Sequence, residues 1–343
     1  MTTDRPGSRR RLPCTRAGPP TQRQRGAALL AAMLTVTLVA TLAAAALWQQ
    51  WRGVEIEAAE RDRVQAAWIL TGALDWARLI LREDARSGGA DHLAEPWAVP
   101  LQDARLSTFL AADRTGAGSS DAEEALDAFL SGQIIDLQSR LNAMNLVENG
   151  QLSQSGFAAM AKLFTLLNLP REELQALAAN LRLAALPGGD QAAGPAPWPP
   201  RRVAQLTWFG LSPATVTALL PYVTILPART AVNLNTASAE VIYASIADLE
   251  LADAERMVAA RARSHFRSLA DAAAQTGLSP GLLAEGQQAV ASRFFEVHGS
   301  LRLAQRQVDE RSLVQRDSLQ VTTLWRERVA RDPDLVSAMG QKP

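Results

Sequence analysis

The stretch AVNLNTASAEVIYASI, residues 231–246, lies in the middle of a long region of helical patterns. A polar turn that contains Asn233, Asn235 and Thr236 comes directly before its apolar half. Because side-chain oxygens of Asn and Thr accept hydrogen bonds from the free N–H groups of a first helical turn, we predict that Asn235 or Thr236 caps a helix beginning near residue 237. Residues 251–278 predict two further short helices, with Phe266 as a buried anchor.

Helical patterns also extend upstream of this turn. Residues 157–167 and 172–186 predict two helices separated by Pro170, and residues 187–202 are rich in Pro and Gly, which is typical of a linker. Further helical patterns follow up to about residue 293. The turn therefore belongs to a helical region of about 145 residues.

Strand patterns lie on both sides of this helical region. IIDLQSRLNAMNL, residues 134–146, alternates apolar and polar residues as a half-buried strand or hairpin does. RFFEVHGSLRL, residues 293–303, alternates in the same way, and SLVQRD and SLQVTTLW supply further strands up to Trp325. The sequence thus predicts an α+β fold in which one α/β domain is interrupted by an all-α insertion.

The N-terminal part carries a long apolar segment. Residues 27–48 contain no charge over 22 residues, which is long enough to cross a hydrocarbon core of about 30 Å. Seven arginines precede it, which predicts a cytoplasmic N-terminus. Residues 51–83 then show an amphipathic helical pattern, with Gly53 as a candidate bend between the two halves.

Composition argues against several function classes. Residues 1–26 hold seven of the 35 basic residues and one of the 35 acidic ones, so the rest of the chain carries 28 basic and 34 acidic residues. This mildly acidic body is a poor nucleic-acid binder. The one cysteine, Cys14, lies in the basic segment, and the three histidines, His92, His265 and His298, show no metal-ligand spacing. No P-loop, GxSxG or HExxH motif is present, so we expect no enzyme.

The arrangement around Gly26 resembles the class III signal of type IV pilins and pseudopilins. On the leader alone, a plain signal anchor that is never cut is an equal alternative. In that family a prepilin peptidase cleaves after the glycine and methylates the new N-terminus, which here is Ala27. Most members carry Glu at the fifth mature position, where this sequence has Ala31.

Taken in order, the leader, the residue 134–146 segment, the insertion with VNLNTA and the residue 293–303 segment resemble the general secretion pathway protein K family, the large minor pseudopilin of type II secretion systems. Members of this family typically lack the fifth-position Glu, in agreement with Ala31. The resemblance divides the chain into a leader 1–26, a membrane stem helix 27–51, a pseudopilin domain 52–149, a helix–hairpin–helix-like insertion 150–290, closing strands 291–330 and a tail 331–343.

The resemblance also implies a function and partners. It implies a subunit at the pseudopilus tip that starts or caps filament assembly with minor pseudopilins I and J, with the major pseudopilin and H as further candidates. The protein would be anchored in the bacterial inner membrane with its body in the periplasm. Some relatives bind calcium, for which the acidic stretch with Asp121, Glu123, Glu124 and Asp127 offers candidate oxygen ligands, although a solvated helix N-terminus is the more common explanation of such a stretch.

Two other functions are compatible with an anchor. A membrane-anchored DNA receptor could grip phosphates with a helix–hairpin–helix module, but residues 225–290 hold five Arg against seven acidic residues and lack a Gly-rich hairpin between residues 246 and 257. We therefore expect no nucleic-acid partner. A minor pilin of a surface pilus would share the leader, but it would not predict the insertion with VNLNTA.

Overall fold

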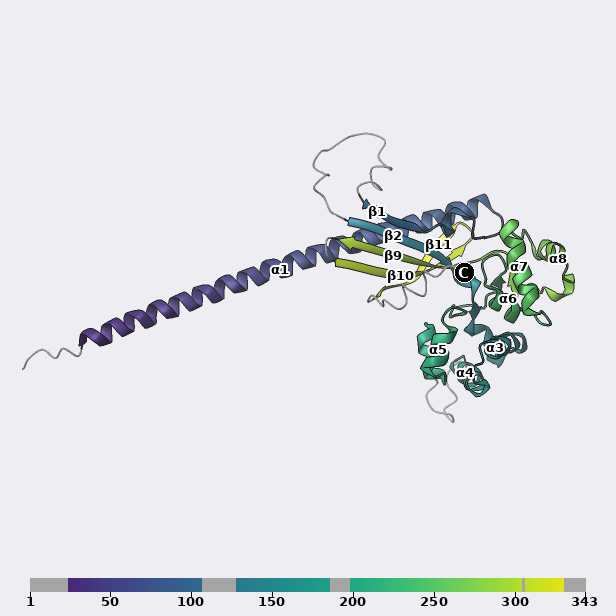
Figure 1. The fold of residues 1–343 in the computed structure, drawn as a ribbon, viewed down its shortest axis with the longest axis horizontal. Coiled ribbons are helices and arrows are strands. Elements are labelled where there is room, and N and C mark those ends of the chain that lie inside the picture. The colour runs from purple at the N-terminus through teal and green to yellow at the C-terminus, as the bar shows by residue number, and fades with distance from the viewer. Residues whose placement is uncertain (1–23, 107–127, 186–197, 304–305, 330–343) are drawn as a thin grey trace, which may run out of the picture. The chain divides into compact units, whose positions relative to one another are not determined.

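The structure is a computed structural model that describes residues 24–106, 128–185, 198–303 and 306–329. The chain divides into two compact units, residues 1–63 and 64–343. Helix α1 (Gln24–Ser87) begins in the first unit and ends in the second, and it continues as a helix through Gly53 (Figure 1). The predicted bend at Gly53 is therefore not present, because one glycine weakens a helix without breaking its hydrogen-bond ladder.

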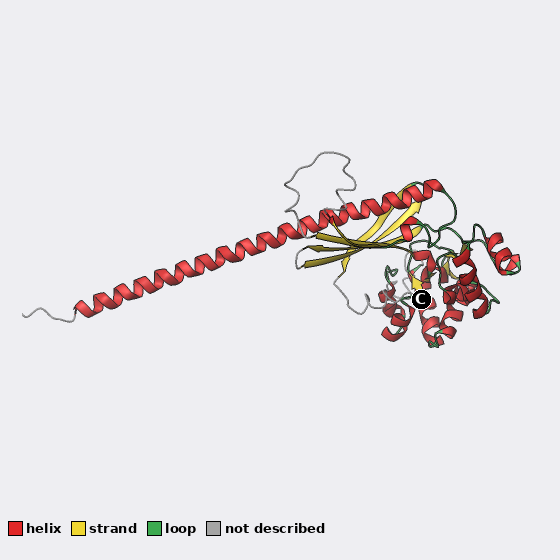
Figure 2. Ribbon diagram, turned by 45° about the horizontal axis from the view of Figure 1, so that its top comes forward, coloured by secondary structure: helices red, strands yellow, loops and turns green. Residues whose placement is uncertain are grey.

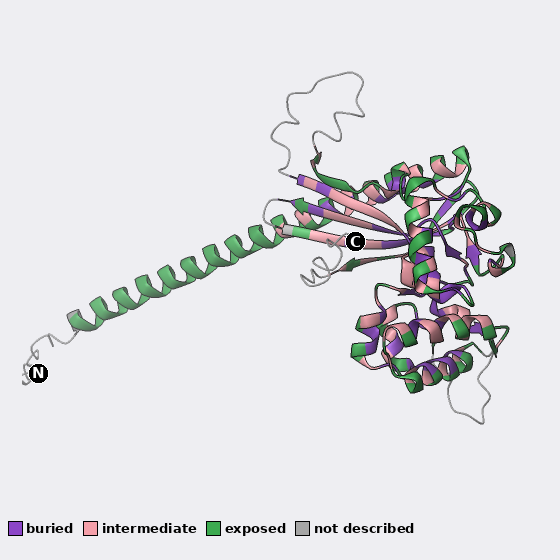
Figure 3. Ribbon diagram, turned by 45° about the vertical axis from the view of Figure 1, so that its right-hand side comes forward, coloured by how far each residue is buried: buried purple, intermediate pink, exposed green. Residues whose placement is uncertain are grey.

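Among the described residues, the first unit is the N-terminal part of α1, residues 24–63. Its large side chains are exposed over residues 27–54, with Leu34 at 69% and Trp51 at 59% exposure (Figure 3). Among the described residues, α1 contains the one segment long and apolar enough to span a membrane, with a mean hydropathy of 2.2 in its most apolar window. An apolar surface of this extent needs a cover, either lipid or other apolar helices.

The second unit combines five long strands with two groups of short helices (Figures 1 and 2). The part that contains the long strands comprises η1 (Pro96–Ala98), β1 (Leu101–Arg105), β2 (Ala128–Asp136), β9 (Phe294–Leu303), β10 (Arg306–Asp317) and β11 (Gln320–Val329). Between β2 and β9 lie η3 (Leu137–Ser139), β3 (Leu141–Asn142), η4 (Ala143–Leu146), β4 (Val147–Glu148), β5 (Gln151–Leu152), α3 (Gln154–Leu166), α4 (Arg171–Ala184), η5 (Val203–Phe209), α5 (Pro213–Leu219), β6 (Val223–Thr224), β7 (Val232–Asn233), α6 (Ala239–Ser245), α7 (Leu251–Arg263), α8 (Leu269–Thr276), η6 (Pro280–Leu282) and β8 (Gln288–Ala289).

The long strands form one antiparallel sheet in the order β1-β2-β9-β10-β11. In the centre, β2 pairs with β9 so that Asp136 lies opposite Phe295. The chain therefore leaves the sheet after β2 and returns to it at β9 in almost the same place. The strands predicted from residues 293–303 and up to Trp325 are confirmed as β9, β10 and β11.

The second half of α1 covers one face of the sheet. Leu74 and Leu81 pack against Phe295, while Leu70 packs against Leu301 at the other end of β9. These leucines recur at helical spacing, so burial of a single stripe explains the predicted amphipathic pattern. The helix thus packs across the sheet from the end with Leu301 to the end with Phe295, where the insertion begins.

The insertion has its own core. Leu163 and Phe164 of α3, Phe209 of η5 and Phe266 before α8 belong to one buried cluster that runs through both groups of helices. The predicted helices at 157–167 and 172–186 are confirmed as α3 and α4. Most of the predicted linker falls within residues 186–197, outside the described residues.

The strand or hairpin predicted at residues 134–146 is confirmed only over residues 134–136, the end of β2, and is wrong beyond them. β2 ends at Asp136, and residues 137–146 form two 3-10 turns and a short bridge that joins Leu141 to Val223 in the insertion. Asp136 Oδ1 accepts a hydrogen bond from Gln138 N at 2.8 Å, and Asn142 Oδ1 accepts one from Met144 N at 3.0 Å. Such side chain–backbone bonds favour turns over extended strands, although the apolar alternation is that of a strand.

Candidate functional site

The residues of the predicted processing site lie at the start of α1. Gly26, Ala27 and Ala31 are exposed, and a Cβ atom built on Gly26 would meet no other atom within 4 Å. Access to this segment is therefore not limited by packing within the chain. Cleavage after Gly26 and methylation of Ala27 remain predictions.

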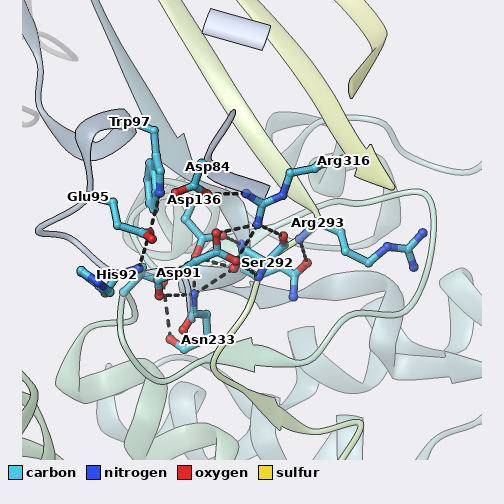
Figure 4. A network of polar contacts seen from close by, with 12 residues as sticks. Asp84, Asp91, His92, Glu95, Trp97, Asp136, Asn233, Ser292, Arg293 and Arg316 are labelled. Atoms are coloured by element: carbon cyan, nitrogen blue, oxygen red, sulfur yellow. Dashed lines mark hydrogen bonds and ion pairs between the residues drawn. The ribbon is translucent and has the colours of Figure 1, made fainter. Parts of the chain in front are cut away.

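A buried polar network holds the two ends of the insertion together (Figure 4). Asp136, the last residue of β2, lies at its centre. Its Oδ2 accepts hydrogen bonds from Ser292 Oγ at 2.6 Å, Thr236 Oγ1 at 2.6 Å and Asn233 Nδ2 at 3.0 Å. Ser292 lies directly before β9, so one carboxylate joins the chain leaving the sheet, the chain returning to it and the VNLNTA turn. We call this site the neck of the insertion.

The three polar residues of the VNLNTA turn act as connectors. The Asn235 side chain forms two hydrogen bonds with the backbone of Phe266, accepting from its N–H at 2.8 Å and donating to its C=O at 2.9 Å. Asn233 and Thr236 both bind Asp136. The predicted capping role of Asn235 or Thr236 is wrong, because α6 begins only at Ala239 and has Ser238 as its N-cap residue.

A second group of charges adjoins the neck. Three carboxylates, Asp84 at the end of α1 and Asp91 and Glu95 in the following loop, bring oxygen atoms within 4.8 Å of one another. Arg316 of β10 enters this cluster: its Nη2 donates to both oxygens of Asp91 at 2.5 and 2.6 Å, and its Nη1 donates to Asp84 Oδ2 at 2.6 Å. Asp91 in turn accepts the backbone N–H of Ser292 at 2.6 Å. The end of α1 is thereby tied to the sheet and to the neck.

Burial dominates the protonation behaviour of this region. It raises the pKa of Asp136 to about 6, although the hydrogen bonds from Ser292 and Thr236 reduce the rise. Burial likewise raises the pKa of Asp91, and Arg316 opposes that rise. The pKa of Asp84 is raised by burial and by the nearby charge of Glu95. A carboxylate removed from water favours its neutral form, which explains the common direction.

Glu296 of β9 is a buried carboxylate whose pKa is lowered, in contrast to the raised pKa values near the neck. Burial alone would raise the pKa of Glu296 in β9, but the hydrogen bond and charge of His298 and the charge of Arg311 outweigh burial and lower it to about 2. Arg311 Nε donates to Glu296 at 2.8 Å. His298 lies half-buried in β9.

Two of the three histidines meet in space. The rings of His92 and His265 stack with their centroids 3.8 Å apart and their planes at 15°. No local motif predicts this contact, because the two residues lie in loops that are distant in the chain. Rings stacked face to face do not direct their nitrogen atoms at a common metal ion, and His298 lies on the sheet.

Sequence reasoning missed most of the charged cluster. Asp84, Asp91 and Arg316 are far apart in the chain, and no local motif connects them. The calcium candidates predicted from the sequence, Asp121, Glu123, Glu124 and Asp127, lie outside the described residues.

An apolar groove lies between α1 and the β1 side of the sheet. It has a volume of about 260 Å³ and is lined mainly by apolar side chains, among them Leu74 and Ile80 of α1 and Val99 and Leu101 near β1. Val99 is 66% exposed at its rim. An open apolar groove with exposed apolar rim residues is typical of protein interaction surfaces.

Comparison with known proteins agrees with this architecture. The family model "Type II secretion system (T2SS), protein K" matches residues 232–291, which begin at the VNLNTA turn and end beside Ser292. Type II secretion system protein K of Pseudomonas aeruginosa PAO1 is 28% identical over 344 residues, covering 93% of both chains. The protein of the same description from Klebsiella pneumoniae is 29% identical over 325 residues, covering 83% of this chain and 91% of its own.

A solved structure has the same fold. It is a chain of the GspK–GspI–GspJ complex from the enterotoxigenic Escherichia coli Type 2 secretion system, with a TM-score of 0.60, 16% identity, and coverage of 80% of this chain and 99% of its own. The relatives match over almost their full lengths, and the family model begins at the VNLNTA turn, which supplies Asn233 and Thr236 to the neck. The chain is therefore similar, over most of its length, to type II secretion system protein K proteins.

Proposed function

We propose that this minor pseudopilin occupies the tip of the pseudopilus and starts or caps the filament together with minor pseudopilins I and J. The observation that carries the proposal is Ala31. In pilin-like filaments the fifth-position Glu accepts the methylated N-terminal amine of a neighbouring subunit. A subunit with Ala31 offers no such acceptor, although its own amine at Ala27 can still be neutralised by another subunit. A subunit that has the amine but lacks the acceptor can make this pairing on one side only, which suits a terminal position.

The position of the insertion supports the same placement. The second half of α1 packs across the sheet from the Leu301 end to the Phe295 end, and the insertion is connected to the sheet at the Phe295 end. The bulk of the insertion therefore lies at the end of the sheet where α1 terminates (Figure 1). Such bulk would hinder a further subunit from stacking beyond this one.

Two apolar surfaces are available for partners and membrane. The stem over residues 27–54 is exposed on all sides, and the groove beside Val99 is open. We propose that lipid covers the stem before assembly, with the arginine-rich N-terminus cytoplasmic and the body periplasmic. In the filament, stems of the other pseudopilins replace lipid, and an apolar side chain of I or J fills the groove.

Processing tests the pseudopilin part of the proposal. Mass spectrometry of membrane-extracted protein should find Ala27 as a methylated N-terminus. Gly26→Val should accumulate as a precursor and abolish secretion of exoproteins, whereas Gly53→Ala, in the same helix, should be processed normally. An intact Met1 or unchanged secretion by Gly26→Val would contradict the proposal.

Partner binding tests the tip assignment. Pull-down of the full-length protein in detergent should capture I and J, and Val99→Asp should weaken that capture without changing processing. Ala31→Glu restores the missing acceptor, so the number of copies per filament should rise above one. A wild-type protein found along the whole filament would refute the tip position.

Calcium binding and the absence of enzymatic activity both remain untested expectations for this chain. Calcium binding is a property of some relatives, and isothermal titration of the full-length protein with Asp121→Asn and Asp127→Asn would show whether the acidic stretch contributes. We expect no enzymatic activity and no nucleic-acid binding. A salt-dependent DNA complex would instead favour the rival DNA-receptor function.

A further inference from the structure

Among the described residues, Asp84, Asp91 and Glu95 form a group of carboxylates whose arrangement resembles a calcium site. Their oxygen atoms lie within 4.8 Å of one another, and the residues line a polar pocket of about 210 Å³. Calcium takes six to eight oxygen ligands and favours carboxylates. The question is whether the surroundings of these carboxylates suit a cation.

All three carboxylates already accept N–H groups. Arg316 donates to Asp91 and Asp84 with three bonds of 2.5–2.6 Å. Glu95 Oε2 accepts the backbone N–H of His92 at 2.8 Å and the indole N–H of Trp97 at 2.7 Å. A calcium ion among these oxygens would face a guanidinium and an indole N–H, which cannot be ligands. As arranged, the cluster does not fit calcium.

Arg316 is fixed in this position by groups outside the cluster. Its side chain is 9% exposed, Nη2 also donates to Ser292 O at 2.8 Å, and the guanidinium lies 4.9 Å from the ring centroid of Phe295. Its backbone N–H donates to Arg293 O at 2.7 Å. The positive charge is thus held by the sheet core and the neck, and does not depend on the carboxylates alone.

We propose that the guanidinium of Arg316 is the built-in counter-cation of this cluster, so that the junction of α1, sheet and insertion forms without a divalent ion. The planar guanidinium provides a permanent charge and several directed N–H donors, which match two carboxylates at once. Removal of Arg316 leaves three carboxylates within 4.8 Å without this charge. The oxygens of Asp84 and Asp91 that Arg316 occupied then become free to bind calcium, while Glu95 keeps its two N–H donors.

Thermal unfolding of the full-length protein in detergent, followed by tryptophan fluorescence, tests the proposal. Each variant is measured in excess EGTA and in calcium. Arg316→Met should lower Tm by about 10 °C in EGTA, because it leaves buried charges uncompensated. Calcium at about a hundredfold above its Kd should then raise Tm by about 5–10 °C. The matched control is Arg293→Met: Arg293 lines the same pocket, but its side chain pairs with Asp317, so no calcium response should be gained.

A double variant separates this cluster from any other calcium site. Arg316→Met with Asp91→Asn should lose the gained response, while a response from elsewhere in the chain would persist. An Arg316→Met protein that folds but gains no response to calcium would overturn the proposal. A calcium response of the wild-type protein that Asp91→Asn abolishes would also overturn it, and this measurement does not require Arg316→Met to fold.

Discussion

Replacement of Asp136 by asparagine tests how the neck depends on a buried carboxylate. The side chain is buried and accepts four hydrogen bonds, three at Oδ2 and one at Oδ1 from Gln138 N. Asparagine retains one acceptor oxygen but turns an N–H₂ group toward a donor on the other side. One buried bond is lost and two donors oppose each other, so Asp136→Asn should destabilise the fold by about 2–4 kcal/mol relative to the ionised carboxylate, which accepts all four bonds.

The pH dependence is the sharper part of this prediction. The folded pKa of Asp136, about 6, exceeds the ordinary value of 3.8. Between these two values the folded protein binds more protons than the unfolded chain, so the free energy of unfolding falls as pH rises. A shift of about two pKa units corresponds to about 3 kcal/mol. The stability advantage of wild type over Asp136→Asn should therefore shrink by about 2.5 kcal/mol between pH 4 and pH 7, since part of the effect lies below pH 4.

Urea unfolding of the full-length protein in detergent at several pH values measures this difference. Asp75→Asn serves as the control, because Asp75 is a carboxylate on α1 with 61% exposure of its side chain. Its profile should remain parallel to that of wild type. Parallel profiles for wild type and Asp136→Asn would refute the reasoning, because they would show that the Asp136 carboxyl titrates alike in the folded and unfolded chains.

Three further substitutions have defined outcomes. The lowered pKa of Glu296 stabilises the wild-type fold by about 3 kcal/mol above pH 4.5, and this stabilisation is lost as pH falls toward 2. Glu296→Gln should lack it at every pH, so the acid unfolding curves of the two proteins should converge at low pH. Gly156→Ala places a Cβ atom 2.1 Å from a backbone oxygen and should cost about 3 kcal/mol or more in urea unfolding, whereas Gly72→Ala, with no atom within 4 Å, should stabilise α1 by up to about 1 kcal/mol. Asn235→Ala leaves the buried N–H and C=O of Phe266 without partners and should cost about 2–4 kcal/mol, with Asn235→Asp, which keeps the acceptor, between it and wild type.

Local periodicity explains which parts of the fold the sequence could predict. Leu70, Leu74 and Leu81 recur at helical spacing, and the strand β9 alternates between its two faces, so both patterns follow from burial of one side. Residues 137–146 show the limit of this reasoning. Their apolar alternation is that of a strand, but the short side chains of Asp136 and Asn142 bind the backbone two residues ahead and turn the chain.

The charged cluster was beyond prediction for another reason. Asp84, Asp91 and Arg316 come together only because α1 ends above the sheet at the strand end that Arg316 occupies. Such a contact depends on strand order and register, which a single sequence does not state. The same holds for Asn235, whose pattern suggested a helix cap, while its partner is the backbone of Phe266, 31 residues away.

The neck explains how so large an insertion can interrupt a small sheet. Antiparallel pairing of β2 with β9 places Asp136 opposite Phe295, so the insertion begins and ends at neighbouring positions and the sheet hydrogen bonds need no change. Pairing alone would leave the helices attached through two flexible connections. The Asp136 network fixes both connections to the VNLNTA turn. Asp91 accepts the N–H of Ser292 and is linked through Arg316 to Asp84, so the same network reaches the end of α1. A subunit whose inserted bulk limits stacking at one end of a filament needs that bulk held in a fixed direction, and a buried polar network with directed bonds provides this where an apolar contact would not.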